Sequence, residues 1–449
     1  MALQEYIIEL LNQKKYAKVH SLLLEMNAID VAEFLGEIPE EQMLYLFRLL
    51  PKDISAEIFS NLDSDMQEYI VKSITDTEIH ELIDMLFIDD TVDFIEELPA
   101  IVVKRVLRNT SNEKRNIINQ FLNYPEDSAG SIMTIEFMDL KKEMSVGEAI
   151  ERIKSHGVNK ETVNTCYVLG ENRLLEGEVT LKDLVLADNN KKIYEIMYDD
   201  TEIVDIPTTM DVEEVSLLFQ KYNALSMPVT DGEKRLVGII TVDDILDIVQ
   251  EEVSEDIEKM AAIVPLEEEY LKASVFSMAK KRFVWLMVLM ITATFTQAII
   301  RSYESMLATY VILIAYIPML TGTGGNSGSQ ASTLVIRGLA LGDIELKDFF
   351  TIIWKELRVA LFVGFFLAII NFIKMYLIDR ISNIYIIIAV SVSLMMTVFV
   401  AKIVGRSPPI IAKKLKLDPA IMATPLISTI VDATTVLIYF SFSMWLLNL

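Results

Sequence analysis

The sequence contains very few of the residues that form disulfides or zinc sites. Its 449 residues include one cysteine, Cys166, and three histidines, His20, His80 and His156. A single cysteine excludes an intrachain disulfide, and three scattered histidines do not supply the Cys/His spacing of a zinc cluster. These absences are typical of a soluble region that resides in reducing cytosol.

Positive charge is scarce in the first part of the chain. Residues 1–270 carry 24 Lys and Arg against 57 Asp and Glu, whereas residues 271–449 carry 16 against 8. Nucleic-acid binding needs clustered basic residues that neutralise phosphates, so we expect no nucleic-acid partner. A signal peptide is lacking as well, because residues 1–15 read as an amphipathic helix containing Glu5 and Glu9. We therefore expect the N-terminus to stay in the cytoplasm.

The second part of the chain contains long stretches without charge. Asp, Glu, Lys and Arg are absent from residues 283–300, 305–336, 359–373, 381–401 and, except for Asp432, 419–449. These stretches predict five transmembrane helices in a multi-pass protein of the cell membrane that contacts membrane lipid. Lys and Arg are concentrated in the loops after the second and fourth spans, so the positive-inside rule places the N-terminus inside and the C-terminus outside.

The soluble part contains an internal repeat. Gly177, Thr180 and Asp183 recur 61 residues later as Gly238, Thr241 and Asp244, and Met133 recurs as Met197. Each copy has an amphipathic helix, short apolar strands and a second helix, which predicts a tandem α/β module. The module resembles a pair of CBS domains.

The remaining segments complete the predicted architecture. Residues 1–125 read as short helices separated by apolar residue–proline pairs, which predicts an all-α, α-solenoid-like N-domain. The tandem module follows at 126–250. An acidic connecting helix is expected to continue from it over 251–272, and a five-helix transmembrane domain occupies 273–449.

The second predicted span contains a run of glycines. Four glycines fall within the seven residues 322–328. The run lacks the Gly-Lys-Ser/Thr of a phosphate loop. Non-helical backbone inside a membrane is tolerated where it lines a water-filled cavity, so we expect an interrupted helix and an ion path here. The alternative is close helix packing through the spacing of Gly324 and Gly328, although packing does not require the amides of Asn326 and Gln330.

One carboxylate, Asp432, lies in the last predicted span. A charge at the centre of a membrane helix costs roughly 2.5 to 3.5 kcal/mol, so a compensating interaction is required. Helical spacing places the hydroxyls of Thr424, Ser428 and Thr435 on the same face as Asp432. Such an oxygen face suits a hard divalent cation such as Mg²⁺, which can keep its waters. The alternative is that Asp432 merely hydrogen-bonds to a neighbouring helix.

Four motifs stand out along the chain: residues 124–134 (YPEDSAGSIMT), 321–330 (TGTGGNSGSQ), 418–420 (DPA) and 425–434 (PLISTIVDAT). Together they resemble the MgtE family of bacterial Mg²⁺ transporters and channels. The resemblance extends to the domain order and covers essentially the whole chain. It implies a homodimer whose pore lies at the subunit interface, lined largely by the second and fifth spans. It also implies that Asp432 is the selectivity-site aspartate. Beside it we expect Thr424, Ser428, Gly325 and Asn326 to line the pore.

Acidic side chains form the candidate regulatory metal site. On the connecting helix they recur at steps of four with a second stripe beside them, and the set is Asp243, Asp244, Asp247, Glu251, Glu252, Glu255, Asp256 and Glu258. Asp89 and Asp93 form a similar pair in the N-domain, and Asp231 ends a strand of the second repeat. Like charges at such spacing repel, and a divalent cation would reverse that effect. The alternative is a merely solvated acidic face; the resemblance implies a "plug" helix whose acids pair with the other domains through Mg²⁺.

The repeated Thr-x-x-Asp endings are candidate nucleotide contacts. Thr180 with Asp183 and Thr241 with Asp244 resemble the ribose- and phosphate-contacting corner of nucleotide-binding CBS modules, which makes ATP a candidate regulator. The alternative is that both threonines simply cap helices.

These features favour a Mg²⁺-selective channel or transporter for Mg²⁺ uptake. Cytoplasmic Mg²⁺ bound to the N-domain, CBS domains and plug helix would close it and so serve magnesium homeostasis. The first alternative is a cation-coupled secondary transporter of divalent metals. The second is a membrane-anchored nucleotide sensor without transport, which would leave Asp432 and the glycine run unexplained. An enzyme is the least favoured class, because the sequence shows no pairing of a nucleophile with a base.

Overall fold

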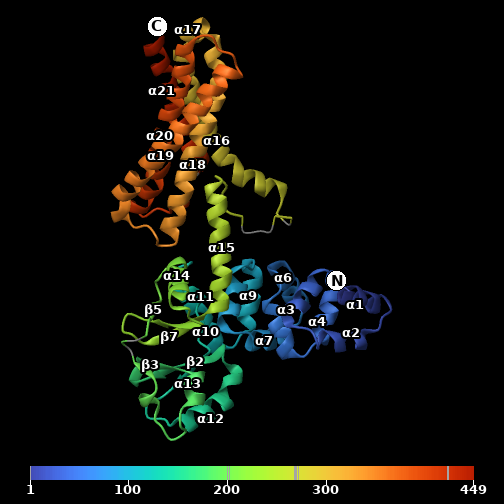
Figure 1. Ribbon diagram of the computed structural model, residues 1–449. Coiled ribbons are helices and arrows are strands. Elements are labelled where there is room, and N and C mark those ends of the chain that lie inside the picture. The colour runs from blue at the N-terminus through green and yellow to red at the C-terminus, as the bar shows by residue number, and fades with distance from the viewer. Residues whose placement is uncertain are drawn as a thin grey trace. The chain divides into compact units, whose positions relative to one another are not determined.

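The computed structural model describes residues 2–199, 201, 203–266, 270–271, 273–421 and 424–448, without the side chains of residues 2 and 3. The chain divides into two compact units, Met1–Val249 and Gln250–Leu449. Figure 1 shows the elements of each unit in chain order. The first unit holds a helical N-domain and a mixed α/β part, and the second contains helices and, among its described residues, no strand.

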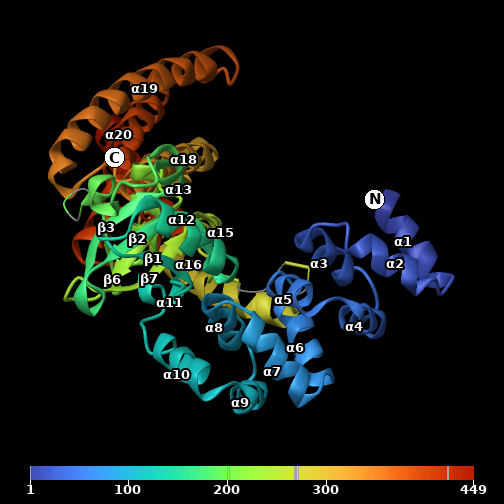
Figure 2. The same ribbon diagram turned by 90° about the horizontal axis from the view of Figure 1, so that it is seen from below.

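The N-domain is the row of short helices shown in Figures 1 and 2. They are α1 (Ala2–Asn12), α2 (Tyr16–Leu23), α3 (Ala28–Gly36), α4 (Glu40–Leu49), α5 (Lys52–Ser60), α6 (Ser64–Ser73), α7 (Asp76–Met85), α8 (Ile88–Glu96), α9 (Ala100–Asn109) and α10 (Asn112–Phe121). Pro39, Pro51 and Pro99 immediately precede α4, α5 and α9. The all-helical prediction and the role of proline in starting helices are therefore confirmed.

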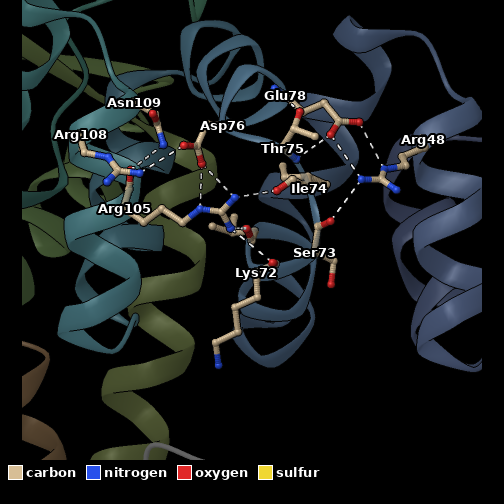
Figure 3. A network of polar contacts seen from close by, with 11 residues as sticks. Arg48, Lys72, Ser73, Ile74, Thr75, Asp76, Glu78, Arg105, Arg108 and Asn109 are labelled. Carbon is tan, nitrogen blue, oxygen red and sulfur yellow. Dashed lines mark hydrogen bonds and ion pairs between the residues drawn. The ribbon is translucent and has the colours of Figure 1, made fainter.

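Two arginines join successive layers of the N-domain (Figure 3). Arg105 of α9 donates to the carbonyl of Ile74 at 2.8 Å, and Arg48 of α4 donates to that of Ser73 at 3.2 Å. These carbonyls lie at the end of α6, where no helical donor remains for them. Arg105 also pairs with Asp76 of α7 at 3.0 Å. Side chains from both sides thus fix the end of α6 and the start of α7.

The α/β part contains two small sheets. In the first sheet the order is β1 (Phe137–Leu140), β2 (Thr162–Leu169), β3 (Leu175–Thr180) and β4 (Tyr198–Asp199), and in the second it is β5 (Ile206–Pro207), β6 (Ser226–Thr230) and β7 (Leu236–Thr241). The β1–β2 and β5–β6 pairs are parallel and the others antiparallel. The accompanying helices are α11 (Ala129–Ile132), α12 (Val146–His156), α13 (Leu181–Leu186), α14 (Val212–Tyr222) and α15 (Val242–Met260). This arrangement confirms the tandem α/β module.

The repeated Met and Gly residues are packing partners across the two copies. A Cβ atom built on Gly238 would lie 2.7 Å from the Met133 sulfur, and one built on Gly177 would lie 2.9 Å from the Met197 sulfur. Real Cβ atoms do not approach this closely, so both positions require glycine while the Met side chains stay in place. Each methionine therefore packs against the sheet of the other repeat.

The connecting helix α15 ends earlier than expected. It ends at Met260, whereas the prediction extended it to Lys272, which lies outside the described residues. Ala262 adopts the left-handed conformation with φ of 58°, and the Ile263 N–H donates to the Glu258 carbonyl at 2.9 Å. This is a Schellman end with alanine in the position that usually holds glycine. Alanine rarely adopts this conformation, so nothing in the sequence indicates that α15 ends here.

The second unit is a bundle of long helices. It contains α16 (Val275–Ser302), α17 (Glu304–Thr309), α18 (Ile317–Ala340), α19 (Phe349–Leu377), α20 (Ile384–Lys414) and α21 (Thr424–Leu447), with 3-10 turns at Val311–Tyr316, Leu346–Asp348 and Pro419–Ile421. Helices α18, α20 and α21 pack against one another, α16 packs on α21, and α19 lies beside α20 in both views. Among the described residues, four helices are long and apolar enough to cross a membrane: Val275–Ser302, Leu346–Leu377, Ile384–Lys414 and Thr424–Leu447. The remaining predicted span, the second along the chain, corresponds to α18, whose 24 residues include many glycines and hydroxyls.

The prediction of an interrupted helix at the glycine run is wrong, because α18 continues through residues 322–328. A Cβ on Gly324 would lie 2.7 Å from Thr397 Cγ2 of α20 and 2.9 Å from Thr435 Oγ1 of α21. A Cβ on Gly405 of α20 would collide with the backbone of Gly328. Close helix packing therefore accounts for Gly324 and Gly328, and the break in the second span falls before Ile317 instead.

Candidate functional site

Two helices bring part of the predicted pore site together. Asp432 of α21 is half-buried, and Ser428 lies one turn before it on the same helix. Gly325 of α18 faces both residues, since a Cβ built there would lie 3.3 Å from Ser428 Oγ and 3.8 Å from Asp432 Oδ1. A methyl group at Gly325 would therefore press against Ser428 and contact the carboxylate.

Hydroxyl groups extend the same wall. Ser329 Oγ of α18 lies 3.4 Å from Ser428 Oγ, a contact that the sequence reasoning missed although Ser329 follows Gly325 by one helical turn. Thr424 is half-buried at the start of α21, and the Asn326 side chain is exposed on α18. Thr435 was expected on this face, but it is buried against Gly324 instead.

The Asp432 carboxylate has no hydrogen bond or ion pair with any residue that the structure describes. The alternative of a simple hydrogen bond to a neighbouring helix therefore finds no support in residues 424–448 or their described neighbours. An uncompensated carboxylate in a membrane-spanning helix is costly, so it requires water or a cation beside it.

A second group of carboxylates lies where α8 meets the start of α15. Asp89 is buried, its Oδ1 atom has no hydrogen-bond partner, and burial together with Asp90 and Asp244 raises its pKa well above the usual value. Burial and the charge of Asp244 raise the pKa of Asp90 to about 6 and that of Glu161 to about 7. The same two causes raise the pKa of Asp93 to about 7, although its side chain keeps contact with solvent.

The pKa of Asp244 is raised as well. Burial raises its pKa to about 6 against the hydrogen bond from Thr241, and the neighbouring charge of Asp243 adds to the effect. The structure therefore brings together four of the predicted regulatory acids, Asp89, Asp93, Asp243 and Asp244. It adds Asp90 and Glu161, which we include with them in the term acid cluster. Glu161 lies far away in sequence and is held by a backbone hydrogen bond to Glu136 at 2.8 Å, so no local pattern identifies it.

The other predicted regulatory acids lie outside the acid cluster, and several of them make contacts of their own. Asp231 Oδ1 accepts the backbone N–H groups of Glu233 and Arg235 at 2.8 and 3.0 Å, so it caps the turn between β6 and β7. Glu255 pairs with Lys259, and Glu258 accepts the backbone N–H of Leu266 at 2.8 Å. The rest are Asp247, Glu251, Glu252 and Asp256, which follow along α15. Within the described residues, no three Asp, Glu, His or Cys side chains converge tightly enough to hold a metal ion as they stand.

The α/β part contains a cavity of about 930 Å³. Its walls come from both repeats and include Asn164, Thr165, Glu178, Thr180, Leu181, Lys182, Val185, Leu186, Ile203, Val204 and residues 222–228. Of the four predicted nucleotide contacts, Thr180 reaches this wall, while Asp183, Thr241 and Asp244 do not. Thr180 Oγ1 also accepts a hydrogen bond from the Asp183 N–H at 3.1 Å. Thr180 therefore caps α13, which agrees with the alternative that the threonines cap helices.

Comparison with known proteins gives matches along nearly the whole chain. The family profile described as a divalent cation transporter, MgtE, matches residues 317–442, the MgtE intracellular N domain matches 26–127, and CBS domains match 129–190 and 193–251. The magnesium transporter MgtE of Thermus thermophilus is 33% identical over 444 residues, which cover 98% of this chain and 97% of that protein. The Bacillus subtilis magnesium transporter MgtE is 30% identical over 97% of this chain and 95% of that protein.

Two solved structures each resemble a little more than half of this chain. The cytosolic domain of the Mg²⁺ channel MgtE in complex with ATP has a TM-score of 0.51 at 30% identity, and it covers 55% of this chain and 99% of that one. The soluble part of a magnesium transporter has a TM-score of 0.53 at 25% identity, with 56% and 97% covered.

Proposed function

The chain belongs to the MgtE family of divalent cation transporters, and on this premise we propose that it is a Mg²⁺ channel for Mg²⁺ uptake. It is a multi-pass membrane protein, and its similarity to transporters supports a role without catalysis. The observation that carries the proposal is the unpaired Asp432 carboxylate beside Gly325 and Ser428. A carboxylate of this kind attracts a hydrated cation.

The proposed permeation path runs along the oxygen-rich face that α18 and α21 share. Asp432 supplies the attractive charge, and the hydroxyls of Ser428, Ser329 and Thr424 receive hydrogen bonds from the ion's waters or donate to other acceptors. Mg²⁺ loses its waters reluctantly, so binding through them lets the ion leave again. A divalent ion gains about 4.6 kcal/mol from 100 mV, so inward flux needs no ATP hydrolysis.

We place the pore at the interface of a homodimer, with the N-terminus in the cytoplasm and the C-terminus outside. Helix α16 contains no buried residue within its own chain, which supports a partner subunit or lipid on most of its surface. The loops rich in Lys and Arg support this orientation.

Closure by cytoplasmic Mg²⁺ is the regulatory part of the proposal. The acid cluster holds like charges close together, as the raised pKa values of Asp90, Asp93, Glu161 and Asp244 indicate. A bound Mg²⁺ would replace repulsion with attraction between α8 and α15 and favour a compact, closed state. The buried Asp89 oxygen without a hydrogen bond is the best placed to receive the ion.

The function is tested by flux into liposomes that contain the full chain. We expect Mg²⁺ entry that follows the membrane potential, and single-channel currents in planar bilayers. Flux without such currents, but dependent on a gradient of a second cation, would favour the alternative of a coupled transporter. Absence of Mg²⁺ flux in protein that is folded would favour the nucleotide sensor.

ATP is proposed to bind in the cavity of the α/β part as a regulator. Lys182 can pair with phosphate, Tyr222 can stack on the base, and Glu178 can accept ribose hydroxyls; all three line the cavity. The ATP complex of a related cytosolic domain supports this proposal. We expect Lys182→Ala to weaken ATP binding about tenfold, because one charge-assisted contact is worth about 1.5 kcal/mol or more.

Equilibrium binding of ATP to the detergent-solubilised full chain measures this effect. Lys191→Ala, an exposed position that does not line the cavity, is the matched control and should bind like the wild type. Equal affinity of the Lys182→Ala protein and the wild type would contradict a phosphate contact at Lys182.

A further inference from the structure

Lys259 is the only basic residue of α15, a helix with many carboxylates. Its Nζ atom lies 2.6 Å from Glu255 Oε1 on the same helix and 2.7 Å from Asp418 Oδ2, which is 159 residues away. The exposed fraction of the side chain is 21% for Lys259, 37% for Glu255 and 32% for Asp418, so the contact is only partly shielded from solvent. One ammonium group therefore joins two carboxylates from distant parts of the second unit.

Asp418 is held in place by the backbone. Its Oδ1 atom accepts the Ala420 N–H at 2.7 Å, so the carboxylate caps the turn Pro419–Ile421 just before α21. Its other oxygen, Oδ2, receives the hydrogen bond from Lys259. Lys259 is thereby connected to the start of the helix that carries Asp432.

The surroundings keep Lys259 charged. Burial alone would lower the pKa of its ammonium, but the hydrogen bonds to Asp418 and Glu255 outweigh burial and hold the pKa above its usual value. Nearby Asp256 has a pKa raised by burial and by the charge of Asp418, which shows that negative charge is in excess at this place. Without the ammonium, Glu255 and Asp418 would face each other as two carboxylates of like charge.

We propose that Glu255 and Asp418 form a cation site that the chain fills with its own Lys259 ammonium. The site holds the end of α15 at the start of α21 without a bound metal. The proposal rests on the proposed function, because it adds a contribution to closure that does not depend on Mg²⁺. Closure then requires less Mg²⁺ than the carboxylates of α15 would need alone.

Removing the ammonium should raise the Mg²⁺ concentration at which half of the channels are closed. We expect Lys259→Gln to raise it roughly three- to tenfold, since a partly shielded ion pair of this kind couples by about that factor. The curve should also become steeper, because the vacated carboxylates can take up an additional Mg²⁺. Lys259→Arg keeps the charge and should restore closure at the wild-type concentration.

The test uses the full chain in planar bilayers with Mg²⁺ titrated on the cytoplasmic side. Asp418→Asn keeps the cap of the turn but removes the charge; it should act like Lys259→Gln, and the double variant should be no worse than the stronger single variant. Lys347→Gln is the control, because Lys347 forms an exposed ion pair with Glu345 in the same unit, at 2.7 Å. An unchanged midpoint for Lys259→Gln, or effects of the two variants that add independently, would overturn the proposal.

Hydrogen exchange separates this proposal from the function on which it rests. In Mg²⁺-free buffer, the amides of 255–260 should exchange faster in Lys259→Gln than in the wild type and the Lys347→Gln control. This measurement does not require transport, so it remains decisive even if the wild type carries no Mg²⁺ current. Unchanged exchange in Lys259→Gln would show that the ammonium does not hold the helix end.

Discussion

Asp432→Asn is expected to reduce Mg²⁺ flux by a factor of about 100 or more while leaving the fold intact. The carboxylate makes no hydrogen bond or ion pair within the described residues, so asparagine of nearly the same size breaks no packing contact. What it removes is the negative charge that compensates a divalent ion inside the membrane. A loss of about 3 kcal/mol of ion stabilisation corresponds to roughly two factors of ten.

The measurement is Mg²⁺ entry into liposomes that contain equal amounts of folded wild-type or variant protein. Asp343→Asn is a suitable control, because it removes one carboxylate from an exposed position between α18 and α19. It should retain wild-type flux. If Asp432→Asn also retained it, the carboxylate could not be on the ion path, and the shared face of α18 and α21 would serve packing alone.

The second span shows which features of a membrane helix can be predicted from its sequence alone. Its glycines were expected to interrupt the helix and to line an ion path, but the helix continues through them. Each glycine costs a helix about 0.5 to 1 kcal/mol relative to alanine, so an interruption was reasonable for an isolated helix. In the structure Gly324 and Gly328 allow α20 and α21 to approach closely, and this packing offsets the cost. That compensation lies in other helices and cannot be derived from the run itself.

Gly325 differs from its neighbours for a reason that only the fold reveals. It points to Ser428 and Asp432, not to the packed interface, because one residue rotates the direction by about 100° around the helix. The sequence placed Asp432 and Ser428 on one face of α21 correctly. It could not place Ser329 of α18 against that face, because the pairing of two helices is a tertiary property.

The acid cluster also combines residues that the sequence pattern predicts with one that only the tertiary fold brings near. The periodic acids of α15 and the pair on α8 were visible in the sequence, and the structure joins Asp89 and Asp93 to Asp244. Glu161 was not visible, since it lies 65 residues after α8 and 81 residues before α15 and has no periodic partner. The acids beyond Gln250 were expected to act together with the cluster, but Glu255 is instead engaged by Lys259.

Lowering the pH from 8 to 6 in Mg²⁺-free buffer is expected to stabilise the packing of α8 on α15. The packed state raises the pKa of Asp90 and Asp244 to about 6 and that of Glu161 to about 7, above their usual values of 3.8 and 4.5. The packed state therefore binds protons more tightly than the separated state. Its stability is gained as the pH falls through these values and lost as the pH rises through them.

The expected gain between pH 8 and pH 6 is about 1 to 2 kcal/mol, with most of it from Glu161, whose pKa lies inside this interval. Asp93 does not contribute to this gain, because its side chain is exposed and solvent screens its charge. Hydrogen exchange of the α8 amides, corrected for the intrinsic effect of pH, measures the gain. Saturating Mg²⁺ should remove most of it, because the ion supplies the charge compensation that protons supply in its absence.

Variants decide whether the acid cluster is responsible. Glu161→Gln combined with Asp90→Asn removes two titrating carboxylates and should flatten the dependence of α8 exchange on pH, whereas Asp53→Asn on the exposed face of α5 should leave it unchanged. Equal flattening by both changes would mean that the total charge of the N-domain controls the packing. Mg²⁺ closure by local bridging would then lose its basis, because a diffuse field is screened within about 8 Å at physiological salt and does not select a divalent ion at one place.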